Sequence, residues 1–157
     1  MMRANIVMAV VLTGPAIVYV LSPQPTQAQS PRSNWSGIFT AAQAQRGEEL
    51  YLQQCSQCHG SDLTGIPRVP PFPGASDRTP ELVGPVFNSN YNEMSIADLF
   101  DRIRISMPQD KPGSLRPRNV AEVLAYMLLQ GGFPPGPHEL PDRSDDLRRI
   151  RFLSQKP

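Results

Sequence analysis

The pentapeptide Cys55-Ser56-Gln57-Cys58-His59 contains both cysteines of the 157-residue chain and one of its two histidines. Two thiols three residues apart can add to the two vinyl groups of one porphyrin, and the adjacent imidazole then points at the iron. Chance would produce this arrangement about once in several thousand sequences of this composition. The pentapeptide therefore predicts one covalently bound haem c, with Cys55 and Cys58 as attachment points and His59 as an iron ligand.

Three other uses of these cysteines are disfavoured. A thioredoxin-like redox pair belongs in a βαβ context, which the sequence pattern does not contain. A structural zinc site needs four ligands, and only His138 and carboxylates remain to join the motif. A disulfide between Cys55 and Cys58 would close a very short loop and stabilise the chain little.

The overall composition limits the classes of function. Fifteen Lys and Arg face 14 Asp and Glu, a formal net charge of +1, so the chain lacks the basic footprint of a nucleic-acid-binding protein. The 18 prolines favour long irregular segments, because proline can neither donate to a strand ladder nor sit inside a helix.

The N-terminal segment 1–28 has the pattern of an export signal. Arg3 precedes the apolar run from Ile6 to Leu21, and Thr26-Gln27-Ala28 supplies small residues for cleavage. The run has sixteen residues, which is short for a membrane span. We expect a periplasmic protein that begins at Gln29. The alternative is an uncleaved anchor in the inner membrane, with the rest of the chain facing the periplasm.

Two helices are predicted on either side of a Pro-rich stretch. The first follows Thr40 as N-cap and runs into Cys55. The second follows Ser95, with Asp98 in capping-box position, and ends before Met107. The stretch 61–92 has no sustained period of 2 or 3.6, which predicts a loop.

A third helix is predicted from Pro117, which suits a first helical turn, although Arg116 before it is a poor cap. Gly131 is the expected C′ residue of this helix. Beyond it, charged residues at helical spacing predict a solvated helix face, namely Asp145, Arg148 and Arg149.

From about Thr40 to Gly132 the sequence resembles the class I c-type cytochromes. Gly47 and Tyr51 match a glycine and an aromatic residue of the family's first helix, and Tyr126 is the expected partner of Tyr51. The resemblance implies an all-α cytochrome c fold, with three or more helices and long Pro-rich loops around one covalently bound haem. It places the cytochrome c domain at 40–133, after a linker at 29–39 and before a Pro-rich, charged C-terminal tail at 134–157.

The resemblance also implies the surroundings of the proximal histidine. Pro80-Glu81-Leu82-Val83-Gly84 is similar to the family's P-x-L-x-G segment, which makes Pro80 and Leu82 candidate cofactor-binding residues. The Pro80 carbonyl should accept a hydrogen bond from Nδ1 of His59, so that Nε2 meets the iron.

For the sixth iron ligand, Ser106-Met107-Pro108 fits the family's Met-Pro dipeptide before the last helix, and Met107 is the expected ligand. Met94 and His138 remain as rival ligands. Tyr91 stands where the family often has a tryptophan that reaches a haem propionate, and its hydroxyl could do the same. Two arginines beside Met107, Arg102 and Arg104, are candidates for neutralising a propionate, with solvent-facing helix charges as the alternative.

An iron with both axial positions filled by protein has no open position for a substrate, so the expected role is one-electron transfer and not enzymatic catalysis. Segments within 107–141 resemble the cytochromes that accompany pyrroloquinoline quinone (PQQ) dehydrogenases. That resemblance implies a redox-protein donor of this class and a downstream cytochrome or oxidase as acceptor. The alternatives are a cytochrome subunit fixed in a dehydrogenase complex, or a haem-based ligand binder or peroxidase.

Overall fold

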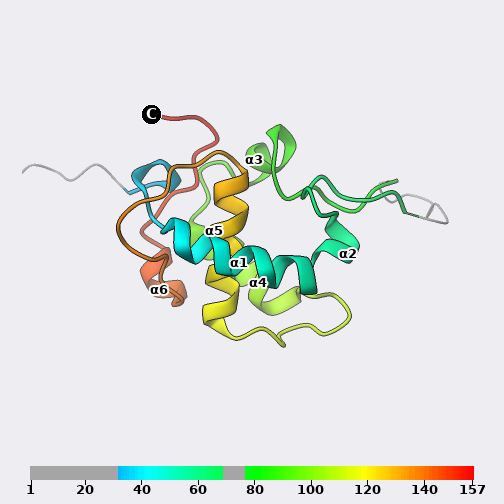
Figure 1. Ribbon diagram of the computed structural model, residues 1–157. Coiled ribbons are helices and arrows are strands. Elements are labelled where there is room, and N and C mark those ends of the chain that lie inside the picture. The colour runs from blue at the N-terminus through cyan, green and yellow to red at the C-terminus, as the bar shows by residue number, and fades with distance from the viewer. Residues whose placement is uncertain (1–31, 69–76) are drawn as a thin grey trace, which may run out of the picture.

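The computed structural model describes residues 32–68 and 77–157, and the expected export signal lies outside this part of the chain. The described residues form short and medium helices joined by irregular segments (Figure 1). In chain order the helices are a 3₁₀ turn η1 (Asn34–Ser36), α1 (Ala41–Gln54), α2 (Ser56–His59), α3 (Pro85–Tyr91), α4 (Ile96–Ser106), α5 (Pro117–Gln130) and α6 (Ser144–Leu147). Within these ranges only isolated bridges and no strands occur, as an all-α fold requires.

The helices α1 and α5 cross at the centre of the molecule (Figure 1), and Gly47 allows them to approach closely. A Cβ atom at Gly47 would lie 1.8 Å from the carbonyl oxygen of Glu122, so no other residue fits without moving α5. One turn further along α1, the rings of Tyr51 and Tyr126 lie 5.3 Å apart. Both expected contacts of the two helices are confirmed.

Local capping signals set the helix ends as the sequence predicts. Thr40 Oγ1 accepts from the backbone N–H of Gln43 at 3.1 Å, and Ser95 with Asp98 forms a complete capping box. Helix α5 begins at Pro117 without a side-chain cap.

One helix end differs by one residue from the prediction. Gly131 is the C-cap of α5 in a right-handed conformation, and Gly132, with φ of 83°, is the left-handed residue that follows. Gly132 therefore takes the C′ role expected of Gly131.

The prediction of a loop over 61–92 is wrong for its last part, where α3 forms. Pro85 occupies the first turn of this helix, after Gly84 with φ of 92°. Phe87 is buried and its ring lies 4.8 Å from that of Tyr91, one turn later. Seven residues are too few for a helical period to stand out in the sequence. A helix this short depends on packing for its stability, and the aromatic pair supplies that packing.

The segments expected to be a linker and a tail both enter the hydrophobic core. Ile38 and Phe39 are completely buried before α1 begins, and Leu147, Ile150 and Phe152 are buried after α5 has ended. The charged face of α6 is solvated as predicted, with Asp145 and Arg148 paired at 3.3 Å, but its opposite side contributes Leu147 to the core. The core therefore extends beyond the expected domain limits of 40 and 133.

A buried amide fastens these two segments to each other. Asn34 donates through Nδ2 to the Leu153 carbonyl at 3.0 Å and accepts from the Leu153 N–H at 2.8 Å. Trp35 donates from Nε1 to the same carbonyl at 2.9 Å. The segment before α1 and the C-terminal segment thus lie side by side, joined by side-chain and backbone hydrogen bonds.

Candidate haem site

The cysteines lie where α1 passes into α2. Cys55 ends α1, with its N–H bonded to the Tyr51 carbonyl, and its own carbonyl accepts from the N–H groups of Cys58 and His59 at 3.1 and 2.9 Å. Residues three apart on such a turn lie on one face, so the two thiols share a side of α2. Both cysteines are free of any disulfide.

The pKa of the Cys55 thiol is shifted in the opposite direction to that of a redox-active thiol. Burial, and to a smaller degree the neighbouring Cys58, raises the pKa of the Cys55 thiol to about 11. Reactive cysteines of redox pairs have a lowered pKa, because the thiolate is the nucleophile. The site therefore does not have the properties of a thioredoxin-like centre.

His59 is held by a backbone carbonyl, as the resemblance implies. Its Nδ1 lies 2.8 Å from the Pro80 carbonyl oxygen, an atom that can only accept, so Nδ1 carries the proton. Nε2 then keeps its lone pair available for a metal ion. The turn directly after His59 is held by the Tyr51 hydroxyl, which donates to the Gly60 carbonyl at 2.6 Å.

Residues 60–68 and 77–84 are joined to α2 and to each other by backbone hydrogen bonds. Gly65 N–H donates to the His59 carbonyl and Leu82 N–H to the Leu63 carbonyl, each at 2.8 Å. Leu63 is buried, and Leu82 is partly buried against the same core. Leu82 is thus fixed to the loop that follows His59 through Leu63.

Met107 is the C-cap of α4, with its N–H bonded to the Ile103 carbonyl at 3.0 Å. Its side chain is partly buried against the core. In Figure 1 the segment 107–116 runs on the same side of the α1–α5 crossing as α2. Met107 would be able to supply a thioether ligand from the end of α4.

The rival ligands are placed less suitably. Met94 lies in the turn between α3 and α4, where its carbonyl accepts from Phe152 N–H at 2.8 Å, and its side chain is 39% exposed. His138 is exposed in the segment that follows α5.

The residues expected near a propionate, Tyr91, Arg102 and Arg104, have different neighbours in the structure. The Tyr91 ring packs against Phe87 and Phe152, and burial raises the pKa of its hydroxyl, with the positive charge of Arg102 opposing that rise. Arg104 instead pairs with Asp101 at 3.1 Å on its own helix. Of the two arginines, Arg102 is therefore the one that acts on Tyr91.

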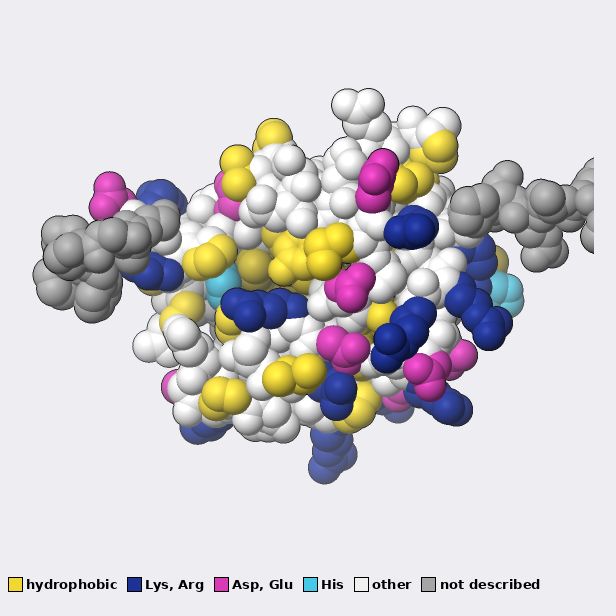
Figure 2. Space-filling view, turned by 180° about the vertical axis from the view of Figure 1, so that it is seen from behind, with side chains coloured by type: hydrophobic (Ala, Val, Ile, Leu, Met, Phe, Trp, Pro, Cys, Tyr) yellow, Lys and Arg dark blue, Asp and Glu magenta, His cyan; other side chains and the backbone are white. Residues whose placement is uncertain are grey.

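The residues present fit a haem c. Two free thiols share one face, an imidazole is oriented through Nδ1, and a partly buried thioether stands at a helix end. Figure 2 shows hydrophobic side chains gathered in a hollow of one face, with a histidine and a basic side chain at its border. An apolar hollow of this kind suits a porphyrin plane.

The comparisons with known proteins agree with this site. The family described as "Cytochrome C oxidase, cbb3-type, subunit III" matches residues 42–127. Cytochrome c-551 of Bacillus subtilis (strain 168) is 34% identical over 123 residues, which cover 78% of this chain and 95% of that protein. No solved structure matches.

The chain therefore belongs to the cytochrome c family. It is an electron-transfer protein and not an enzyme, and its cofactor is a covalently bound haem c with iron. Within the described residues, no helix is long and apolar enough to cross a membrane.

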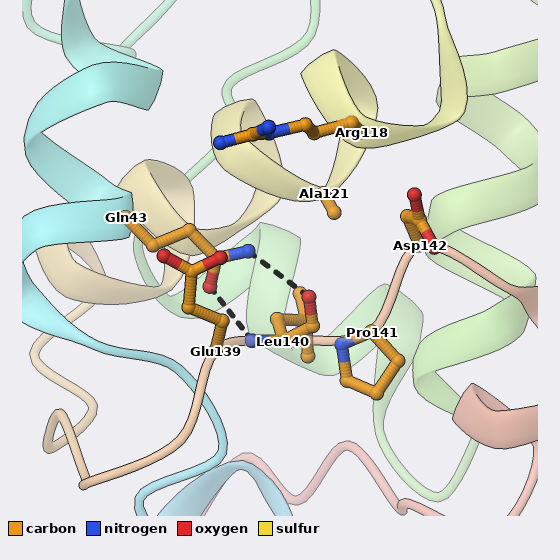
Figure 3. A pocket seen from close by; sticks show the side chains of 7 residues that line it. All are labelled: Gln43, Arg118, Ala121, Glu139, Leu140, Pro141 and Asp142. Carbon is orange, nitrogen blue, oxygen red and sulfur yellow. Dashed lines mark hydrogen bonds between the residues drawn. The ribbon is translucent and has the colours of Figure 1, made fainter.

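A cavity of about 390 Å³ lies away from this site, at the start of α1 (Figure 3). Gln43 points into it, and both polar atoms of its amide are engaged: Nε2 donates to the Leu140 carbonyl at 3.0 Å and Oε1 accepts from the Leu140 N–H at 2.7 Å. This exchange fixes the C-terminal segment on α1 and has a structural role.

Proposed function

We propose that the protein is an exported single-haem cytochrome in which His59 and Met107 bind the iron. The orientation of His59 by the Pro80 carbonyl, at 2.8 Å, is the single observation that carries the proposal. A histidine whose Nδ1 is engaged in this way presents Nε2 to a metal, and it follows directly on the two thiols that would attach the cofactor. Met107 supplies a soft thioether, which favours iron(II) and raises the reduction potential.

The side chains around the site determine what the bound group can do. If His59 and Met107 both bound the iron, no position would be left for a substrate, and the haem would supply one-electron redox chemistry. Tyr91 and Arg102 are proposed to bind a propionate, because the Tyr91 hydroxyl can donate a hydrogen bond and the positive charge of Arg102 influences the same hydroxyl. Their role is to hold the cofactor and not to transfer protons.

For the partners, we propose a periplasmic PQQ-dependent dehydrogenase as electron donor and a downstream cytochrome or oxidase as acceptor. The support is the likeness of segments 107–115, 125–128 and 132–141 to the cytochromes that accompany such dehydrogenases. The formally near-neutral chain gives little long-range steering, so the apolar surface around the site is the proposed docking face.

Stopped-flow mixing tests the donor. Oxidised cytochrome at micromolar concentration should be reduced rapidly by a PQQ dehydrogenase that has been reduced with its alcohol or sugar substrate. The control is the same mixture without that substrate. Absence of haem reduction would refute this donor, while leaving the electron-transfer class intact.

Export is tested separately. N-terminal sequencing of the purified holoprotein should begin at Gln29, and cell fractionation should place it in the periplasm. A chain that retains Met1 and sediments with membranes would instead support the anchored alternative.

A cytochrome subunit fixed in a larger complex is the second candidate, because the matching family is named for a subunit of an oxidase. An exposed apolar face around Phe133 would favour a fixed subunit, but Phe133 is only 3% exposed. Size-exclusion chromatography of the untreated periplasmic fraction separates the two: a carrier elutes near the mass of one chain, and a subunit elutes with its complex.

A ligand binder or peroxidase would bind carbon monoxide at neutral pH.

A further inference from the structure

Thr79 links the segment that carries Pro80 to the helix that carries His59. Its Oγ1 donates to the Cys58 carbonyl oxygen at 2.5 Å and accepts from the Ile66 N–H at 2.9 Å. The Ile66 carbonyl lies farther from the same hydroxyl, at 3.4 Å. The hydroxyl proton is therefore directed at Cys58, and a lone pair is directed at Ile66.

We propose that Thr79 is a positioning residue for the axial histidine, and that its hydroxyl tunes the reduction potential through the His59–Pro80 hydrogen bond. The inference rests on the proposed function, because it takes His59 as an iron ligand. Among the described residues, the Thr79 hydroxyl bonds to Ile66 and Cys58 and not to the imidazole.

Two consecutive hydrogen bonds join α2 to the segment that carries Thr79 and Pro80. Cys58 and His59 are neighbours on α2, and Thr79 and Pro80 are neighbours on the returning segment. The Thr79–Cys58 hydrogen bond joins the first residue of each pair, and the His59–Pro80 hydrogen bond joins the second. One bond alone would leave α2 free to pivot about it, whereas two adjacent bonds fix both the distance and the orientation of the ring.

The position of Thr79 is set by further contacts. Thr79 N–H donates to the Ile66 carbonyl at 3.0 Å, so both the backbone and the side chain of Thr79 are hydrogen-bonded to Ile66. Gly65 packs so closely that a Cβ there would lie 2.2 Å from the Thr79 carbonyl oxygen. Thr79 therefore cannot shift toward Gly65 to compensate for a lost hydroxyl.

The electronic consequence has a definite sign. A hydrogen bond from Nδ1–H to a carbonyl raises the basicity of the imidazole, which favours the more positive iron(III) and lowers the potential. Loosening that bond should raise the potential. Since Thr79 acts one step removed, we expect a change of about threefold in the equilibrium constant for reduction, or about 28 mV at about 59 mV per tenfold change.

The test compares three variants of the full-length holoprotein. Thr79→Val keeps the shape but removes the hydroxyl, Thr79→Ser restores it, and Thr64→Val is the matched control. Thr64 lies in the same loop, and its hydroxyl donates to Asp62 Oδ1 at 2.9 Å, with no contact to the motif. The measurements are the reduction potential and, by NMR of the reduced protein, the exchange rate of the His59 Nδ1 proton.

Thr79→Val should raise the potential and speed exchange of the Nδ1 proton about tenfold, while Thr79→Ser and Thr64→Val should match the wild type. If Thr79→Val keeps the wild-type potential and exchange rate, the inference is wrong and the proposed function stands. If wild-type spectra show no histidine on the iron, both fail.

A Thr79→Val protein that does not retain haem would shift the test to the wild type. There the Thr79 hydroxyl proton and the Ile66 amide proton should exchange slowly with solvent. Rapid exchange of both would overturn the inference.

Discussion

Replacing Gly47 with alanine tests the helix crossing on which the site is built. The new Cβ would lie 1.8 Å from the Glu122 carbonyl oxygen and 3.0 Å from the Val123 nitrogen. Real Cβ contacts are almost never shorter than 3.0 Å, so α5 must retreat from α1 by about 1 Å.

The magnitude follows from two opposing effects. Overpacking a tight contact costs about 1–3 kcal/mol, and more when backbone must move. Alanine in place of a mid-helix glycine returns about 1 kcal/mol of helix propensity. Retreat of α5 would also lengthen the Arg46–Glu122 ion pair, which is 2.7 Å in the native structure. We therefore expect Gly47→Ala to lower the free energy of unfolding by about 1–2 kcal/mol.

The assay is urea unfolding of the holoprotein, followed by far-UV circular dichroism and by the Soret band. Gln45→Ala is the matched control, because Gln45 is exposed two residues away on the same helix. Its stability should stay close to the wild-type value. A Gly47→Ala variant that is as stable as the wild type, or more stable, would refute the close crossing.

Three more variants test other parts of the structure. Asn34→Ala should lower the free energy of unfolding by about 1–3 kcal/mol, because it removes the acceptor of the Leu153 N–H and one of the two donors to the Leu153 carbonyl; unchanged urea unfolding would contradict this. Burial raises the folded-state pKa of Tyr51 above its ordinary value near 10, so the contribution of Tyr51 to stability should be constant below pH 10 and should be lost progressively above it. Tyr51→Phe should start about 1 kcal/mol lower, since the bond to Gly60 is lost, but fall less steeply between pH 10 and 11.5; an equally steep fall would exclude Tyr51 as a cause. Cys58→Ser should leave one covalent link to the haem, seen as a red-shifted pyridine haemochrome band; an unshifted band would mean that Cys58 is not attached.

Sequence signals predicted the main helices well because those signals are local. A threonine cap before α1, the Ser95–Asp98 box before α4 and Pro117 at the start of α5 each act within a few residues. Gly47 was predicted from resemblance, and the crossing explains why a larger residue does not fit there.

The contributions that the sequence did not predict depend on distant partners. Phe152 is buried against Phe87 and Phe133, but Ile150, Phe152 and Leu153 form too short an apolar group near the C-terminus to show a sustained period. Asn34 pairs with Leu153 across 119 positions, and a lone asparagine carries no local sign of such a contact. The segment 29–39 and the tail were therefore interpreted as flanks although both supply core residues.

At the site, the sequence predicted the residues of the motif and of its P-x-L-x-G partner, but not the residue that holds these two segments together. The motif and its P-x-L-x-G partner were visible in the sequence, and the His59–Pro80 hydrogen bond is present as expected. Thr79 was not singled out, although its position directly before Pro80 was the available signal. A single threonine in a Pro-rich stretch gains meaning only when the chain brings it against Cys58.

The central claim is that His59 and Met107 bind one covalently attached haem. The most direct measurement is the visible spectrum of the purified protein in both redox states, for the wild type, Met107→Ala and Met94→Ala. The oxidised wild type and Met94→Ala should both show a weak charge-transfer band at the red edge of the spectrum, and Met107→Ala should lose it. A band that survives in Met107→Ala would contradict the assignment of the sixth ligand and the account built on it.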